Sequence, residues 1–468
     1  LSVPKTYFLP LNKRPSTRRQ FLATGGACAA GFAIGCQTPS QESSKPENKT
    51  VRKSRPKKVR LAGIGVGGKG AVDIAGCAKA GAEFVALCDI DKKRLDAAKK
   101  RYPRAKTFTD YREMLEEVND IQGVTISTPD HHHAPAAIRA IEKGLSTFVQ
   151  KPLTHSIHEA RILTLAARQH GVQTLMGNQG HSGNDVRNFC ELIWAGAIGP
   201  VREAHIWTNR PVWPQALDRP TRQDPVPDWL DWEGFLGPAR WRPYVGPGEG
   251  SRGRGAYNPF NWRGWWDFGT GALGDMACHL MDPAVWALKL GVPDTVEAGS
   301  EGANDETGPE WSIITYEFPS RGEMPPVKVV WYDGGKKPSN ELLGLKKDEE
   351  SPANGSLFIG DAGKLTCGTY GGSPQFTPDS KVQRFPKPDQ VLERSPGHYR
   401  EFVGAINGKP LGNASNFDFA GPFTEMVLLG NLAIRTGRKV EWDTVELNAT
   451  NMDVSHLVKR EYRDGWDV

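Results

Sequence analysis

The stretch VRLAGIGVGGKGAVDIAGCAKAGAEFVALCDID, residues Val59 to Asp91, decides the fold of this chain. Its first apolar residues, which end at Ile64, predict a strand that runs into the loop Gly65-Val66-Gly67-Gly68-Lys69-Gly70. Helical spacing follows from Ala71 to Lys79, and a second apolar strand ends at Asp89. Strand, G-x-G-x-x-G loop, helix, strand and acid in this order predict a βαβ unit that binds a dinucleotide.

The glycines and the acid of this unit each have a role in that prediction. Gly65 makes the tight turn, Gly67 (followed by Gly68) lets the backbone approach a pyrophosphate, and Gly70 lets helix and strand pack closely. The diphosphate would lie at the N-terminus of the helix, where unpaired N–H groups and the dipole favour negative charge. Asp89 would bind a ribose 2′-hydroxyl and repel a 2′-phosphate, so the predicted cofactor is NAD rather than NADP.

The chain continues to alternate between strand and helix as far as Met176. The predicted elements after the first unit are helices at 91–101 and 111–118, a strand at 123–127, a helix at 134–143, a strand at 146–150, a helix at 157–170 and a strand at 172–176. Repeated units of this length predict a doubly wound parallel sheet, in which ligands bind at the carboxyl ends of the strands. The first domain is therefore expected to be an α/β Rossmann domain over residues 58–181.

After about Ser182 the pattern changes to strands separated by Gly/Pro turns. A helix is predicted at 186–195, strands at 201–207, 311–318, 327–332, 356–359 and 364–367, and late helices at 398–407 and 423–436. This order predicts an α+β second domain with an antiparallel sheet over residues 182–468. Two connections, 209–262 and 334–354, are long for loops without structure, which usually means a functional or disordered segment.

Composition narrows the class of protein. The chain has 468 residues, of which 38% are hydrophobic and 24% charged, and a net charge of +5, part of which lies near the N-terminus. These values are typical of a globular protein of two to three domains, and they do not indicate a nucleic-acid surface. The seven cysteines include no C-x-x-C pair, so no disulfide framework is expected.

The N-terminal residues resemble an export signal. Ser16 to Leu22 reads STRRQFL, close to the twin-arginine pattern, and a short Gly/Ala-rich run follows to Gly35. This run is too short to span a membrane. Cys36 ends a lipobox-like sequence whose first residue, Ala33, is atypical, so lipidation and its absence both remain open. A twin-arginine signal is expected at 1–36 and a disordered tether at 37–57, which makes the protein periplasmic or a membrane-anchored lipoprotein; the alternative is a disordered basic tail.

The glycine loop and four later motifs, in this order, resemble the Gfo/Idh/MocA family, the relatives of glucose–fructose oxidoreductase and inositol dehydrogenase. The later motifs are Thr128-Pro129-Asp130-His131-His132-His133, Gln150-Lys151-Pro152, Gly177-Asn178-Gln179 and Asp275-Met276-Ala277-Cys278-His279. The likeness runs from about Val59 to Asp443, and residues 261–282 resemble exported members of the family.

The resemblance implies a Rossmann domain followed by an α+β domain with a large open, mostly antiparallel sheet. That sheet often serves oligomerisation in the family, so a homodimer or homotetramer is expected. The resemblance also implies hydride transfer between a nicotinamide and a carbon of a sugar or polyol. One departure is visible, because the usual Glu-Lys-Pro appears as Gln150-Lys151-Pro152. A neutral Gln150 cannot hold Lys151 as an ion-pair partner would, which leaves the pKa of Lys151 open to other neighbours.

Oxidation of a carbinol needs a group near the nicotinamide that takes the hydroxyl proton. Lys151 follows a strand end and precedes a proline that fixes the backbone, and burial would bring its pKa towards neutrality. Asp275 and His279 are four residues apart, so on a helix they share one face. They are candidates for base and relay, and the resemblance places the family's catalytic Asp and His at these positions. The alternatives are a surface lysine, a helix N-terminal acid and a packed histidine.

Residues at the predicted strand ends are expected to line the cofactor. They are Thr128, Pro129, His131, His133, Gln150, Lys151 and Asn178. The three consecutive histidines also invite a metal interpretation. In an extended segment, however, His131 and His133 share one face and His132 the other, so one ion cannot easily bind all three. No metal is predicted.

The substrate is expected to be a carbohydrate. Gln179 and His181 follow a strand end and are candidate contacts for sugar hydroxyls. Many of the 14 tryptophans lie between Trp194 and Trp266, and such rings suit stacking against sugar faces. The residues proposed to form the floor of the sugar-binding site are Trp207, Trp213, Trp262, Trp265, Trp266, Arg210 and Arg263. The alternative is a hydrophobic cap over the cofactor or an interface.

Three functional classes remain: an NAD-dependent oxidoreductase acting on a carbohydrate or polyol hydroxyl, a redox-neutral glycosidase or lyase, and a non-catalytic NAD-binding protein. An exported enzyme with tightly bound NAD cannot release the reduced cofactor at each turnover. Its redox cycle must therefore close on the enzyme. Either a second substrate reoxidises the cofactor, or one sugar is oxidised at C3, loses its glycosidic group, gains water and is reduced again. A non-catalytic protein would require the lysine, aspartate and histidine all to be incidental.

Overall fold

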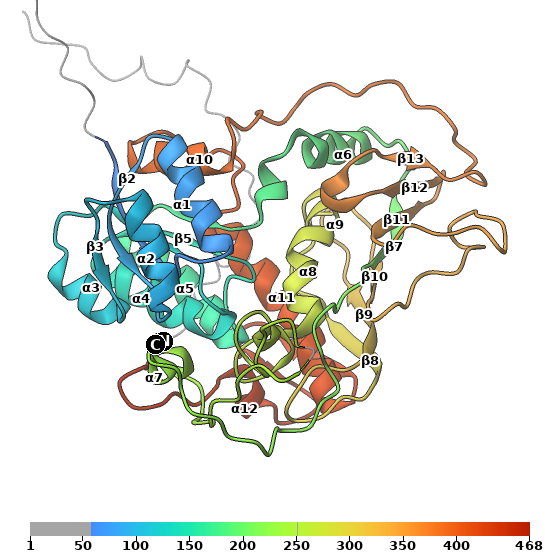
Figure 1. The fold of residues 1–468 in the computed structure, drawn as a ribbon. Coiled ribbons are helices and arrows are strands. Elements are labelled where there is room, and N and C mark those ends of the chain that lie inside the picture. Colours follow the sequence, from blue (N-terminus) through green and yellow to red (C-terminus); the bar gives the residue numbers. More distant parts are fainter. Residues whose placement is uncertain (1–57, 250) are drawn as a thin grey trace, which may run out of the picture. The chain divides into compact units, whose positions relative to one another are not determined.

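The computed structural model describes residues 58–249 and 251–468 (Figure 1). The predicted signal at 1–36, with Cys36, and the predicted tether at 37–57 lie outside the described residues. Within the described part of the chain, no helix combines the length and the apolar composition that a membrane crossing requires.

The first sheet has six parallel strands in the order β3-β2-β1-β4-β5-β6. Its elements are β1 (Arg60–Ile64), α1 (Lys69–Lys79), β2 (Glu83–Cys88), α2 (Lys92–Arg101), β3 (Lys106–Phe108), α3 (Tyr111–Glu117), β4 (Gly123–Ile126), α4 (His133–Glu142), β5 (Ser146–Val149), α5 (Ile157–His170) and β6 (Thr174–Met176). Every residue of β4, β5 and β6 is buried, as expected for strands that helices cover on both faces. The Rossmann prediction is confirmed.

The register of this sheet brings the polar motifs together. Ile64 at the end of β1 pairs with Ile126 at the end of β4, and Ile126 pairs in turn with Val149 of β5. Val149 pairs with Met176 of β6. The residues that follow these strand ends therefore meet along one edge of the sheet.

The second sheet has nine strands in the order β13-β12-β11-β7-β10-β9-β8-β14-β15. They are β7 (Val201–Trp207), β8 (Thr295–Glu301), β9 (Trp311–Phe318), β10 (Val327–Tyr332), β11 (Gly355–Gly360), β12 (Lys364–Cys367), β13 (Gln375–Phe376), β14 (Val440–Asp443) and β15 (Asn448–Ala449). Only the β7–β10 pair is parallel among the described strands of this sheet. The mostly antiparallel second sheet is thus confirmed.

Four helices contribute many residues of the main core. They are α6 (Asn184–Trp194), α8 (Gly271–Leu280), α9 (Asp282–Ala287) and α11 (Phe417–Thr436). In Figure 1, α11 lies between α5 and the second sheet, and it contacts α5, α8 and β8. Because α8 is packed on this central helix, any side chain that it presents to the first sheet is rigidly placed.

Residues late in the chain return to the first domain. Helix α10 (His398–Ile406) packs on α1, where the ring of Tyr399 occupies the space left by Gly76. Residues after the short helix α12 (Ser455–Val458) contact the first domain through Arg460 and Trp466. Residues far beyond the expected domain boundary at 181 therefore pack against the helices of the N-terminal domain.

Candidate active site

A cavity of about 890 Å³ lies at the carboxyl edge of the parallel sheet. One end is lined by the glycine loop and Asp89, and the other by Lys151, Asp275 and His279. The facing walls include Trp213 and Trp262 of the long connection at 209–262, Arg263 directly after it, and Tyr370 of the 3-10 turn that follows β12. The predicted cofactor and catalytic motifs thus share one cavity.

The glycine loop is tightly seated on the neighbouring strand ends. Gly65 has φ +75°, and a Cβ there would lie 2.7 Å from the carbonyl oxygen of Ser127. A Cβ on Gly70 would lie well inside van der Waals contact with the Gly65 carbonyl oxygen. Both positions therefore require glycine, which fits a loop whose backbone approaches a diphosphate at the start of α1.

Asp89 is buried beside this loop and also lines the cavity. Its Oδ2 accepts hydrogen bonds from the N–H groups of Val66 (2.8 Å) and Gly67 (3.2 Å), and its Oδ1 accepts one from Asp91 N–H (3.0 Å). Burial raises the pKa of this carboxyl, although the backbone hydrogen bonds act against that rise. The acid thus fixes the loop that it adjoins.

The residues present fit a dinucleotide. The loop has glycine where a side chain would block it, and an acid ends the second strand. In addition, Thr128 lines the cavity, and its buried Oγ1 has no hydrogen-bond partner within the described residues. Buried polar atoms without partners are costly, so a bound ligand that supplies a partner for Thr128 would stabilise the site. Asn178, which was expected to contact the cofactor, is buried and does not line the cavity.

Lys151, Asp275 and Arg263 form an ion-paired cluster at the other end of the cavity. Lys151 Nζ donates to Asp275 Oδ1 (2.8 Å) and to the Asp275 backbone oxygen (2.6 Å). Arg263 Nε donates to the same Oδ1 (3.0 Å). His279 lies one helical turn after Asp275 in α8 and also lines the cavity. The chain therefore gathers all three predicted catalytic residues.

Electrostatics separate the roles of Asp275 and His279. Burial alone would raise the pKa of Asp275, but the charges of Lys151 and Arg263 outweigh it and lower that pKa from 3.8 to about 2. Burial, together with the charge of Lys151, lowers the pKa of His279 from 6.5 to about 3. At neutral pH the site therefore holds a carboxylate that orients Lys151 and a neutral imidazole. Asp275 serves better as an anchor than as the base that the sequence suggested.

Gln150 turns away from Lys151 and binds a buried acid in α1. Its Nε2 donates to Asp73 Oδ2 (2.8 Å), which also accepts from Ser127 Oγ (2.8 Å). Asp73 Oδ1 accepts from the Tyr399 hydroxyl (2.8 Å) and pairs with Lys69 Nζ (3.2 Å). The partner that Gln150 cannot provide for Lys151 is thus provided by Asp275 from the second domain.

Two family models match this chain. The model of the NAD-binding Rossmann domain of an oxidoreductase family matches residues 58–178, and the model of that family's C-terminal alpha/beta domain matches residues 207–468. The chain belongs to the Gfo/Idh/MocA oxidoreductase family. Its N-terminal domain binds NAD, which is the cofactor.

Two bacterial relatives match part of the chain. A glycosyl hydrolase family 109 protein of Shewanella putrefaciens is 30% identical over 200 residues, which are 39% of this chain and 43% of the relative. An alpha-N-acetylgalactosaminidase of Shewanella oneidensis is 31% identical over 201 residues, with the same shares. The chain thus spans less than half the length of these relatives.

Solved structures share the fold. The WlbA dehydrogenase of Bordetella pertussis, in complex with NADH and UDP-GlcNAcA, has a TM-score of 0.56 at 16% identity, and the match covers 83% of this chain and 99% of that one. A levoglucosan dehydrogenase in complex with NADH has a TM-score of 0.53 at 17% identity, and covers 82% and 99%. At these identities the likeness concerns the fold alone.

The Gfo/Idh/MocA strand-end motif places its histidines differently from the expectation. Asp130–His132 is a 3-10 turn rather than an extended segment. Neither His131 nor His133 lines the cavity: the ring nitrogens of His131 bond to the carbonyls of Phe268 and Phe235, and those of His133 to the carbonyls of Pro152 and Thr128. His132 does line it. Burial lowers the pKa of all three rings, and no group of three His, Cys, Asp or Glu side chains suited to a metal occurs in the described part.

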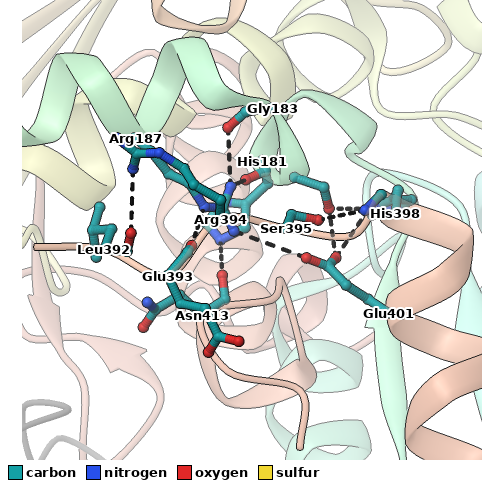
Figure 2. A network of polar contacts seen from close by, with 12 residues as sticks. His181, Gly183, Arg187, Leu392, Glu393, Arg394, Ser395, His398, Glu401 and Asn413 are labelled. Atoms are coloured by element: carbon teal, nitrogen blue, oxygen red, sulfur yellow. Dashed lines mark hydrogen bonds and ion pairs between the residues drawn. The ribbon is translucent and has the colours of Figure 1, made fainter. Parts of the chain in front are cut away.

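His181 was expected to contact substrate but lies outside the cavity. Its Nδ1 bonds to Asp282 (2.9 Å), its Nε2 to the carbonyl of Asn413 (3.1 Å), and its ring stacks on Trp286. Figure 2 shows it in a buried network with Arg187 and Glu401. The ring ties the two domains together. Its neighbour Gln179 does line the cavity.

Three of the predicted substrate tryptophans also lie outside the cavity. The indole N–H groups of Trp207, Trp265 and Trp266 donate to the carbonyls of Pro352, Ala256 and Asn304, respectively. All three rings are buried. The aromatic wall of the cavity is built instead by Trp213, Phe260 and Trp262. Phe260 directly follows the cis peptide bond Asn258-Pro259. Loop folding, which spacing does not reveal, decides which ring faces the site.

Asp130 and Tyr370 are among the residues of the site that were missed from sequence. Asp130 is buried, lines the cavity and accepts from Thr270 Oγ1 (2.7 Å), and burial raises its pKa to about 7. Tyr370 has φ +63°, and its ring lies perpendicular to that of His279, with 5.3 Å between ring centroids. A Cβ on Gly180 would overlap the Tyr370 ring. Non-glycine residues in this left-handed conformation gather at functional sites, but a sequence gives no signal for it here.

Proposed function

We propose that this protein is an NAD-dependent oxidoreductase that acts on a hydroxyl group of a carbohydrate or polyol. The observation that carries the proposal is the ion-paired Lys151 at the end of a cavity that begins at the dinucleotide loop. When bound, NAD supplies the two-electron oxidation of a carbinol carbon and its reversal. The chain must then supply the groups that bind the alcohol and move its proton.

Lys151 is well placed to bind the reacting oxygen. An ammonium group has three N–H donors, and Asp275 uses two of them. The third is available to an oxygen of the substrate, where the positive charge stabilises a developing alkoxide. His279 lies on the same wall, and its Nδ1 has no hydrogen-bond partner within the described residues, so it is the candidate relay for the hydroxyl proton.

The facing wall suits a sugar. Arg263 stacks its guanidinium over the ring of Trp262, 4.3 Å from the centroid, and over that of Phe260 at 4.7 Å. Aromatic faces pack against the C–H faces of sugars, while polar side chains at their rim bind the hydroxyls. Trp213, Gln179 and Tyr370 continue this mixed lining.

A redox-neutral glycosidase is the second candidate. The named relatives include a glycosyl hydrolase family 109 protein and an alpha-N-acetylgalactosaminidase. In such a cycle C3 of the sugar is oxidised, which acidifies the C2 hydrogen, and the glycosidic group leaves by elimination. Water then adds at C1, a proton returns to C2, and C3 is reduced again. The net reaction is hydrolysis, and the electrons that leave C3 return to it.

An experiment with a panel of glycosides in heavy water separates the two candidates. The purified protein is incubated without added NAD, and the released sugars are examined by NMR. Deuterium at C2 with hydrogen retained at C3 is the result expected of the glycosidase. A stable keto-sugar would establish the oxidoreductase instead, and its yield should rise when NAD is added. No change in any glycoside or free sugar would argue against both.

We further propose export by the twin-arginine route. The support is the pair Arg18-Arg19 ahead of Gln20-Phe21-Leu22 and a weakly apolar run. Replacing both arginines by lysine should leave the protein in the cytoplasm, as cell fractionation would detect. Unchanged export would show that the pair belongs to an ordinary basic tail. Lipidation at Cys36 and a homodimer or homotetramer stay predictions, which the intact mass and the mass in solution test.

A further inference from the structure

Two segments from outside the Rossmann domain close the end of the cavity next to Asp89. The first, here the α7 segment, comprises residues 228–237 and includes α7 (Trp232–Leu236). The second, the C-terminal segment, comprises residues 460–468. Both contribute to the cavity lining, through Asp231, Glu233, Gly234 and Phe235 in one and Arg463 and Trp466 in the other. In a Rossmann domain the acid that ends the second strand marks the adenosine half of the dinucleotide.

The α7 segment is attached to the residues directly after β2. The N–H of Lys92 donates to the Trp229 carbonyl (2.9 Å), and the N–H of Asp231 donates to the Ile90 carbonyl (2.9 Å). The ammonium of Lys93 lies over the Trp229 ring, 4.0 Å from its centroid. The segment is thus fixed within a few residues of Asp89.

The C-terminal segment is attached to the other side, along α3 and α4. Arg139 donates to the carbonyls of Gly465 (3.0 Å) and Asp467 (3.1 Å). Trp466 is only 6% exposed and packs edge-on against Tyr111 and His132. The guanidinium of Arg112 covers its ring at 4.0 Å. A buried indole held on three sides in this way is costly to displace.

The two segments are also joined to each other. Arg463 Nη2 pairs with Glu233 Oε2 (2.6 Å), and the Arg463 N–H donates to the Pro238 carbonyl (3.3 Å). Arg460 and Tyr462 hold the start of the C-terminal segment to the fully buried Glu159, each at 2.8 Å. The joined segments bridge the end of the cavity from β2 to α4.

We infer that the α7 segment and the C-terminal segment are part of the nucleotide site and retain NAD through successive turnovers. Release of the adenosine half requires the Arg463–Glu233 pair or the Trp466 packing to open first. The advantage of retaining NAD rests on the proposed function. A glycosidase cycle that returns its electrons to the same sugar has no need to exchange the cofactor. The retention itself is a property of the binding site and is measured without substrate.

The test follows exchange of bound nucleotide. The protein is freed of unbound nucleotide by gel filtration, mixed with an excess of isotope-labelled NAD, and sampled over time by mass spectrometry after denaturation. The unmodified protein should exchange slowly. Trp466→Ala should exchange at least ~10-fold faster, because weakened contacts act mainly on dissociation. Arg463→Ala, which removes an ion pair that stabilises only weakly, should exchange a few-fold faster. Trp241→Ala, which removes a 59% exposed ring outside the cavity, is the matched control and should exchange like the unmodified protein.

The outcomes are distinct from those for the reaction type. Complete exchange of the unmodified protein within the mixing time, or unchanged exchange in both variants, would overturn the inference whatever reaction is found. Arg463→Ala removes a partly exposed ion pair and leaves the indole in place, so it keeps the test decisive if Trp466→Ala fails to fold. Slow exchange with no activity on any glycoside would support retention and count against the proposed function.

Discussion

Replacing Lys151 by alanine should lower turnover at least ~100-fold, the scale expected when an acid–base or charge-stabilising group is lost. The fold should survive, because Arg263 stays paired with Asp275 and the buried carboxylate is not left alone. Turnover of the substrate identified by the glycoside panel measures the first effect, and thermal unfolding the second. Lys328→Ala, which removes an ammonium paired with Glu203 on the second sheet, is the control and should change neither.

His279→Ala extends this prediction to the neutral ring. Its turnover should fall on the same scale if the imidazole takes the hydroxyl proton. Turnover equal to that of the unmodified protein in either variant would show that the altered side chain is incidental to the reaction. If turnover falls in Lys151→Ala and not in His279→Ala, another residue of the cavity takes the hydroxyl proton. Asp130, whose pKa is raised to about 7, is then the candidate.

Replacing Gly70 by alanine should largely abolish nucleotide binding. The added Cβ would overlap the carbonyl oxygen of Gly65, so the loop and the start of α1 must move apart. Overpacking of this kind costs about 1–3 kcal/mol, and each 1.4 kcal/mol taken from binding is a tenfold loss of affinity. The amount of NAD that copurifies, and calorimetric titration with NAD, measure the change.

Gly299→Ala is the matched control for Gly70→Ala. Gly299 lies in β8, and a Cβ there would meet nothing within 4 Å. This variant should therefore bind nucleotide like the unmodified protein. Normal NAD content in Gly70→Ala would mean that the loop adapts to a side chain, and that close packing at this glycine does not control cofactor binding.

The sequence predicted the parallel sheet well because its signal is strong and local. Buried strands such as β4 and β5 read as short apolar runs, each followed by a helix. The short strand β3 was missed because its residues are largely exposed. Strand β8 was missed for a related reason, since all of its residues except Val296 are half-buried or exposed and it contains Gly299. Such strands are held by their neighbours in the sheet rather than by their own composition.

The site was predictable where chain geometry alone determines position. Lys151 follows a parallel strand, and Asp275 and His279 share one face of a helix, so their approach to the cavity followed from spacing. The side chains in the long connections were not predictable in this way. Trp262 faces the cavity while Trp265, one 3-10 turn later, is buried against Tyr257. That difference arises from tertiary packing, which the sequence pattern does not carry.

The hydrogen bond between Gln150 and the buried Asp73 couples two positions that lie far apart in the sequence. The Asp73 carboxylate accepts a hydrogen bond from the Gln150 amide, at the position where the resemblance to the Gfo/Idh/MocA family implies a glutamate. A glutamate introduced there alone would set two carboxylates 2.8 Å apart in a dry environment, and one of them would have to bind a proton. The same change made together with loss of the Asp73 charge avoids this conflict. Substitutions at residues 73 and 150 are therefore expected to have non-additive effects on stability.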